Sequence, residues 1–90
     1  PMDLRQLRYF CAVVDQGSFN RAAEALNISP PALSLSIKKL EQELDVTLLE
    51  RKPGRILPTS FGNCLYANAQ QIQANVETAV DQLNRIRGIG

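Results

Sequence analysis

The sequence has no histidine and only two cysteines, and both shortages narrow the possible functions. Cys11 and Cys64 are far apart, so the ligand spacings of zinc fingers are absent, and the imidazole on which many hydrolytic sites depend is missing. No constellation of residues typical of an enzyme is visible. We therefore expect a protein that is not an enzyme and that holds no metal or cofactor of its own.

Long apolar stretches and a strong net charge are missing as well. The chain has no apolar run of about eighteen residues and no charged-then-apolar leader, so we expect neither a membrane span nor secretion, and we interpret the protein as cytoplasmic. Pro1 ahead of Met2 is typical of a remnant of tag cleavage. Ten basic and nine acidic side chains nearly cancel, so only the distribution of charge can indicate nucleic-acid binding. The length of 90 residues suits one small domain.

Residues 29–44, SPPALSLSIKKLEQEL, form the most informative segment. Ser29 can cap a helix, and Pro30 suits its first turn because proline already has the helical φ and no N–H to satisfy. The predicted apolar stripe of this helix consists of Leu33, Ile37, Leu40 and Leu44. The opposite face offers small, apolar and cationic groups, namely Pro31, Ser34, Leu35, Lys38 and Lys39. An ordinary surface helix with one stray leucine is the alternative.

Two helices are predicted ahead of this segment. The first covers about residues 4–16 and ends at Gly17, with an apolar stripe of Leu4, Leu7, Cys11 and Val14. Cys11 is then a core thiol, since a redox-sensing thiol would need exposure and a nearby cation. Ser18 can cap a second, short helix over residues 19–26, in which Phe19, Ala22, Ala23 and Leu26 can face inward.

The short helix and the central helix are separated by only three residues, 27–29. Asn27 tolerates the left-handed conformation at a helix end, and Ser29 starts the next helix. A short helix, a tight turn and a capped second helix predict a helix-turn-helix, whose second helix lies in the major groove of DNA. A plain helical hairpin within a bundle is the alternative that this stretch leaves open.

The segment after the central helix predicts a β-hairpin. VTLLER and ILPT flank residues 52–55 (KPGR), where proline followed by glycine suits a type II turn. Such a hairpin would be a wing with a cationic tip, and the predicted basic surface consists of Lys38, Lys39, Arg51, Lys52 and Arg55. We expect contact with phosphates or the minor groove, against the alternative of a merely solvated tip. Arg51 could instead pair with a carboxylate such as Glu50.

The last part of the chain predicts a long helix that Thr59 can cap and that runs to about Arg87. Its predicted coiled-coil seam consists of Leu65, Ala69, Ile72, Val76, Ala79, Leu83 and Ile86. About 29 residues at 1.5 Å each give roughly 43 Å, too long for so small a domain to cover. We therefore predict a homodimer through this helix, which also suits a palindromic operator. The pattern leaves parallel and antiparallel pairing open.

Taken in order, several segments resemble the N-terminal region of LysR-type transcriptional regulators. They are MDLRQLRYFCAVVDQGSFNRAAEALNIS, PALS followed by IKKLEQELDVTLLER, and RILPTSFG. The resemblance covers nearly the whole chain and implies a mainly α fold: a winged helix-turn-helix (residues 2–58) with a small β-hairpin wing, then a long linker helix for dimerisation (residues 59–90). It also implies an effector domain that binds a small-molecule inducer, for which this chain has no room, and a tetramer in many full-length relatives.

The departures from the family pattern fall on the predicted reading face. Family members usually carry glutamine where this sequence has Pro30, and often arginine and glutamine where it has Leu35 and Ser36. The remaining apolar face can contact thymine methyl groups. The predicted DNA-binding residues are Pro30, Pro31, Ser34, Leu35, Lys38, Arg51, Lys52 and Arg55.

The leading functional hypothesis is a sequence-specific double-stranded DNA-binding domain that regulates transcription and binds an interrupted palindromic operator as a dimer. The alternative is a winged-helix module for protein–protein interaction, which the proline–leucine face and the near-neutral total charge favour. DNA binding through phosphates weakens steeply with salt, so a salt titration separates the two hypotheses.

Overall fold

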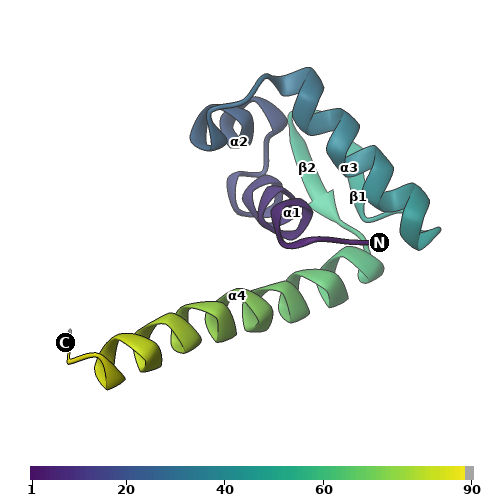
Figure 1. The fold of residues 1–90 in the computed structure, drawn as a ribbon. Helices are drawn as coiled ribbons and strands as arrows, with labels where there is room; N and C mark the ends of the chain where they lie inside the picture. Colours follow the sequence, from purple (N-terminus) through teal and green to yellow (C-terminus); the bar gives the residue numbers. More distant parts are fainter. Residues whose placement is uncertain (89–90) are drawn as a thin grey trace.

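The chain is mainly α-helical with one small β-hairpin, as predicted (Figure 1). The structure is a computed structural model that describes residues 1–88, so the last two residues of the predicted segment 59–90 lie outside the described residues. In chain order the elements are α1 (Leu4–Gln16), α2 (Phe19–Leu26), α3 (Pro30–Leu44), β1 (Leu49–Lys52), β2 (Arg55–Pro58) and α4 (Ser60–Ile86). Figure 1 shows α4 running beneath the other elements and extending well past them.

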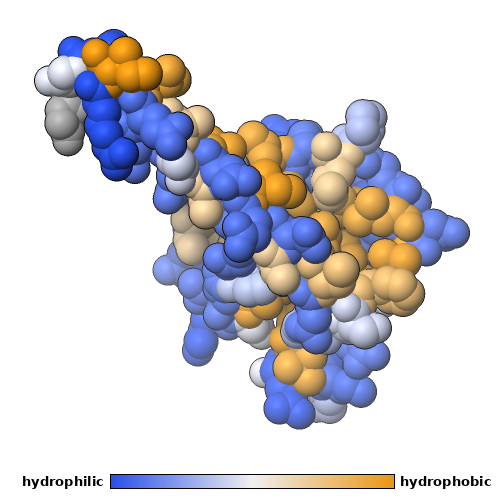
Figure 2. Space-filling model, turned by 90° about the horizontal axis from the view of Figure 1, so that it is seen from below, coloured by the Kyte–Doolittle hydropathy of each residue, from blue (hydrophilic) through white to orange (hydrophobic). Residues whose placement is uncertain are grey.

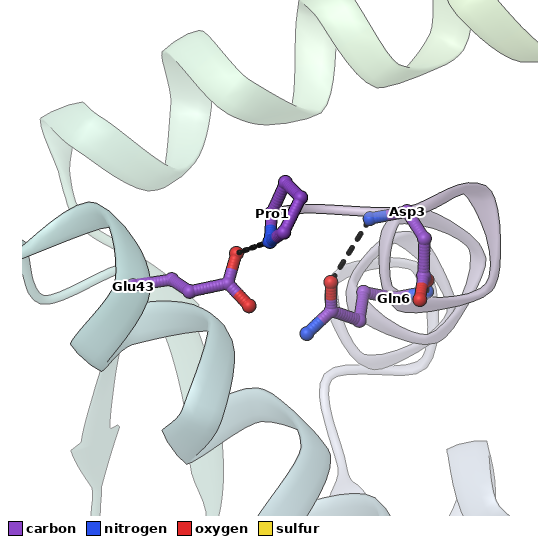
Figure 3. A network of polar contacts seen from close by, with 4 residues as sticks. All are labelled: Pro1, Asp3, Gln6 and Glu43. Carbon is purple, nitrogen blue, oxygen red and sulfur yellow. Dashed lines mark hydrogen bonds and ion pairs between the residues drawn. The ribbon is translucent and has the colours of Figure 1, made fainter.

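Helix α1 begins with a capping box. The Asp3 carboxylate accepts a hydrogen bond from the backbone N–H of Gln6 at 2.8 Å, and the Gln6 side chain accepts one from the Asp3 N–H at 3.0 Å. Figure 3 shows this pair beside the amino group of Pro1, which lies 3.7 Å from the Glu43 carboxylate at the end of α3. The ion pair is exposed and contributes little to stability.

The predicted caps of the helix-turn-helix are present. The hydroxyl of Ser18 accepts from the Arg21 N–H at 3.2 Å, and that of Ser29 accepts from the Ala32 N–H at 3.2 Å. Asn27 has a left-handed backbone with φ of 59°, which ends α2, and Pro30 begins α3 three residues later. The ends of both helices therefore follow from Ser18, Asn27 and Ser29, each of which favours a helix end.

Helix α1 packs on two sides, which explains why its predicted single apolar stripe is only partly right. Phe10 and Val13 face the main core, whereas Leu7 and Cys11 face α4. Leu4 is exposed in the first turn of α1, where it borders the same depression as Gln73 and Val76 of α4. The main core consists of Phe10, Val13, Ala22, Ala23, Leu33, Ile37, Leu40, Leu48 and Leu49.

Helix α3 presents Leu33, Ile37 and Leu40 to that core, as predicted, but Leu44 in its last turn is exposed. The helix continues to Leu44 beyond the elements that cover the rest of its stripe, and Asp45 then ends it with a left-handed backbone. Glu41, on the same helix, accepts hydrogen bonds from the backbone N–H groups of Leu48 at 2.7 Å and Leu49 at 3.4 Å. The start of the hairpin is thereby fixed to α3.

The hairpin is antiparallel, and its register pairs Leu49 with Pro58, Glu50 with Leu57, Arg51 with Ile56, and Lys52 with Arg55. Gly54 has φ of 75° at the third position of the turn, which a type II turn requires and glycine adopts without strain. Gly17 ends α1 with a left-handed backbone, as predicted, and a further structural glycine is Gly62 in the first turn of α4. A Cβ atom there would lie 2.1 Å from the carbonyl oxygen of Leu48, so only glycine lets α4 approach the start of the hairpin.

Helix α4 is half covered and half free. Ala69 is fully buried against Leu7 and Cys11, and the hydroxyl of Tyr66 donates a hydrogen bond to Asp15 at the end of α1. Burial, with the Asp15 charge as a smaller cause, raises the pKa of the Cys11 thiol, as expected for a core cysteine. Beyond this contact α4 projects away from the body, and Figure 2 shows apolar surface at its free end.

None of the helices described over residues 1–88 is long and apolar enough to cross a membrane.

Candidate nucleic-acid interface

The outward face of α3 is the first component of the candidate interface. Pro30, Pro31, Leu35 and Lys38 are exposed, and Ser34 is half-buried at the edge of this face. Leu35 leaves 54% of its surface open to solvent although it lies between two residues of the helix that face the core. Because α2 and the tight turn hold the N-terminal half of α3 at the surface, these side chains can enter a groove without rearrangement.

The wing is the second component, and its two faces carry different residues. Because side chains alternate along a strand, Arg51 shares the inward face with Leu49 and Ile56, whereas Lys52 and Arg55 lie opposite each other on the outward face. Lys52 pairs with Glu50 at 3.7 Å, with both side chains about half exposed. Glu50 therefore pairs with Lys52 and not with Arg51, which corrects the alternative considered for Arg51.

Arg51 joins the two components. Its guanidinium carbon lies 4.4 Å from the centroid of the Phe19 ring at the start of α2, and Nη2 donates to the Ser34 hydroxyl at 3.4 Å. The predicted residues of the wing and of α3 therefore form one surface. Sequence reasoning did not include Phe19 in this surface, although the period of two in the hairpin already puts Arg51 on the inward face.

An open pocket of about 380 Å³ continues the surface from the wing tip to the start of α2. It is lined by Gly17, Ser18, Phe19, Asn20, Arg51, Lys52, Gly54, Arg55 and Ile56. Hence Lys52 and Arg55 border the same depression as Ser18 and Asn20, more than thirty residues earlier in the chain. Ser18 and Asn20 were not predicted as interface residues, because no local pattern shows which helix end a hairpin tip will approach.

The residues of the predicted dimer seam divide into two groups. Leu65, Ala69 and Ile72 pack against Leu7 and Cys11 of the same chain, so this half of the seam already has an intramolecular partner. The prediction of a continuous exposed seam is corrected accordingly, because α1 covers its first half. The exposed apolar residues of the second half are Val76, Ala79, Val80, Leu83 and Ile86. Val80 was missed, although it lies four residues after Val76 and three before Leu83 on the same face.

The fold and its partly basic outward face define a winged helix-turn-helix domain. Residues 4–63 match the family described as "Bacterial regulatory helix-turn-helix protein, lysR family". The chain therefore belongs to the lysR family of bacterial regulatory helix-turn-helix proteins, as the resemblance predicted.

Individual relatives agree with this assignment. The chain is 42% identical over 88 residues to the HTH-type transcriptional regulator BenM of Acinetobacter baylyi, covering 98% of this chain and 29% of BenM. It is 42% identical over 85 residues to the nitrogen assimilation regulatory protein nac of Klebsiella aerogenes, covering 94% of this chain and 28% of that protein. Both relatives are named as regulators and not as enzymes, and the chain spans less than a third of either.

The fold is also that of a solved domain of the family. The crystal structure of BenM_DBD in complex with catB site 1 DNA superposes with a TM-score of 0.91 at 43% identity, covering 96% of each chain. This agreement extends over the helix-turn-helix, the hairpin and α4, since almost the whole chain is included.

Proposed function

We propose that this chain is the DNA-binding part of a longer LysR-type transcriptional regulator and that it binds double-stranded DNA sequence-specifically as a homodimer. The observation that carries the proposal is the junction made by Arg51, which unites the outward face of α3 and the cationic wing in one surface. A helix that enters the major groove, flanked by a hairpin that reaches the backbone or minor groove, is the arrangement that such a surface suits. The BenM domain of the same fold was crystallised with DNA.

Phosphate contact is assigned to Lys38 on α3 and to Lys52 and Arg55 on the wing. Lys52 and Arg55 lie directly opposite each other in the hairpin, and such a pair of like charges destabilises it by about 0.2–1 kcal/mol. A phosphate between them removes this repulsion, so the pair is better matched to bound DNA than to solvent. The ion pair of Lys52 with Glu50 is exposed and easily exchanged for a phosphate.

Base contact is assigned to the N-terminal half of α3. Pro30, Pro31 and Leu35 offer no hydrogen bonds to base edges, so their contribution is apolar contact with thymine methyl groups. Ser34 has a hydroxyl that can donate to a phosphate or a base acceptor while its oxygen accepts from Arg51. This face therefore makes fewer hydrogen bonds to bases, and more apolar contacts, than arginine and glutamine at the same positions would make.

Dimerisation is assigned to the free half of α4. Val80 and Leu83 leave 51% and 61% of their surfaces exposed, on a part of the helix that no other element of residues 1–88 covers. A second copy of the same helix would bury this strip and duplicate the recognition helix. Two recognition helices related by a two-fold axis fit an interrupted palindromic operator.

The chain divides into a winged domain (residues 2–58) and a linker helix (residues 59–90). The rest of the regulator would carry an effector domain for a small-molecule inducer and would allow a tetramer at full length. A bacterial regulator of this kind acts in the cytoplasm, where its DNA is. The chain itself would hold no cofactor.

A salt titration of DNA binding tests the proposal. Three phosphate contacts in each copy predict a slope of log K against log salt of about −5 for the dimer, at about −0.9 per contact. The experiment measures anisotropy of a fluorescent duplex of random sequence and of one selected on this chain. A flat salt response, or no binding to either duplex, would contradict the proposal and favour the protein-interaction module.

A further inference from the structure

We propose that Arg51 is a positioning residue that locks the wing against both helices of the helix-turn-helix, and that its main role is not to bind a phosphate. This inference rests on the proposed function, because the position of the wing matters only if the wing contacts DNA. It changes the role that the sequence suggested for Arg51 and gives Phe19 a role that the sequence did not suggest.

The direction of the Arg51 side chain is the first observation that supports a positioning role. In the hairpin register Arg51 pairs with Ile56, and both share the inward face with the buried Leu49. The two cations of the outward face, Lys52 and Arg55, lie directly opposite each other across the hairpin, and all three cations line the open pocket at the tip. A residue whose strand position directs it toward the body is suited to hold the hairpin in place.

The contacts of the Arg51 guanidinium are the second observation that supports a positioning role. Its carbon lies 4.4 Å from the centroid of the Phe19 ring, well within the range of about 6 Å over which a cation–π contact is effective. The hydrogen bond to Ser34 is long at 3.4 Å, so stacking on Phe19 is the stronger of the two contacts. One side chain of β1 thus reaches the first residue of α2 and the reading face of α3.

The remaining attachments of the hairpin show why such a lock is needed. Glu41 fixes the beginning of β1, and the backbone N–H of Ile56 on β2 donates to the Gly17 carbonyl at 3.2 Å. Leu49 at the beginning of β1 is buried in the main core and Ile56 packs against it, and nearer the turn Arg51 contacts Phe19 of α2 and Ser34 of α3. A two-stranded hairpin is only marginally stable alone, so without Arg51 the tip could swing away from α3.

This arrangement predicts a distinct signature in DNA binding. Loss of a positioning residue lowers affinity while the number of neutralised phosphates stays the same, whereas loss of a phosphate ligand lowers the salt slope by about 0.9 for each contact. A cation–π contact at an exposed site corresponds to about a two- to fivefold effect. We expect Arg51→Ala and Phe19→Leu each to raise Kd by this factor for each copy in the dimer, with an unchanged slope.

The experiment combines a double-mutant cycle with salt titrations on a fluorescein-labelled duplex that carries the operator selected by the unmodified chain. Arg51→Ala, Phe19→Leu and the double variant are compared, with Arg55→Ala as the matched loss of an arginine on the outward face. The double variant should bind no more weakly than either single variant, because both changes remove the same contact. Phe19→Tyr keeps the ring and should restore the affinity of the unmodified chain. Arg55→Ala should lower the slope.

A second measurement needs no DNA and therefore separates this inference from the proposed function. Hydrogen exchange of the Ile56 amide, which bonds to Gly17, reports on docking of the wing. It should be about two- to fivefold faster in Arg51→Ala and Phe19→Leu and unchanged in Arg55→Ala and Phe19→Tyr. Circular dichroism establishes that each variant is folded, and Arg51→Met, which keeps an apolar stem without the cation, replaces Arg51→Ala if the latter unfolds.

Three results would each overturn the inference. They are a fall of the salt slope in Arg51→Ala equal to that in Arg55→Ala, additive losses of affinity in the double variant, and an Ile56 amide whose exchange is the same in Phe19→Leu as in the unmodified chain. Failure of all forms of the chain to bind DNA would overturn the proposed function, while the exchange measurement would still decide whether Arg51 holds the wing.

Discussion

Leu35 allows the sharpest prediction about base recognition. It lies on the outward face of α3 with 54% of its surface exposed. Complete burial of a leucine contributes about 1.5–3 kcal/mol, so covering the exposed 54% against DNA contributes at most about 0.8–1.6 kcal/mol. Leu35→Ala should therefore weaken binding to the selected operator by at most about fourfold to fourteenfold for each half-site that a copy occupies, and leave binding to random duplexes nearly unchanged.

The thymine methyl is the partner that this reasoning assigns to Leu35. Replacing the contacted thymine by uracil keeps the base pair and the O4 acceptor and removes one methyl group, which corresponds to about 0.8 kcal/mol or about a fourfold loss of affinity. Leu35→Ala should remove the sensitivity to uracil, and Leu35→Arg should shift the preference toward guanine, whose O6 and N7 can bond one arginine.

Anisotropy titrations on operators with single thymine-to-uracil replacements measure both effects. Each half-site is scanned with the unmodified chain and with Leu35→Ala. If uracil throughout the half-site leaves affinity unchanged and Leu35→Ala binds like the unmodified chain, Leu35 takes no part in recognition. Specificity would then have to come from DNA shape or from the wing.

Two further predictions concern α4. Replacing Val80 and Leu83 by glutamate should leave the winged domain folded and give a monomer in sedimentation, because both side chains are exposed and lie beyond the contact with α1. An unmodified chain that is monomeric at high micromolar concentration would contradict this assignment. Gly62→Ala should lower the free energy of unfolding in urea by about 1–3 kcal/mol, because its Cβ would lie 2.1 Å from a backbone oxygen, even though alanine is the better helix former. Ser60→Ala in the same turn is the control, and equal stability of the two variants would refute the close approach.

Local signals predicted most of the fold. Ser18, Asn27 and Ser29 favour helix ends in any context, and the hairpin turn follows from proline and glycine alone. The period of the apolar residues located the helices well, but it does not say which partner covers a stripe. Leu65 and Ala69 therefore looked like part of a dimer seam, whereas they pack against α1 of the same chain.

The candidate interface was also only partly predictable from the sequence. Leu35 and Lys38 follow from the helical period, because both lie opposite the stripe that packs on the core. The contact of Arg51 with Phe19 joins residues 32 positions apart, and its formation depends on how the hairpin docks on α2. No local pattern encodes that docking, so the contact between Phe19 and Arg51 became visible only in the structure.

Selection of operators from a pool of random duplexes tests the central claim most directly. The chain is immobilised, bound duplexes are amplified over several rounds, and the enriched sequences are aligned. We expect two inverted half-sites separated by a fixed interval, each with at least one thymine whose position responds to Leu35→Ala. An enriched sequence without two-fold symmetry would contradict the dimeric arrangement, and no enrichment over the starting pool would contradict sequence-specific DNA binding itself.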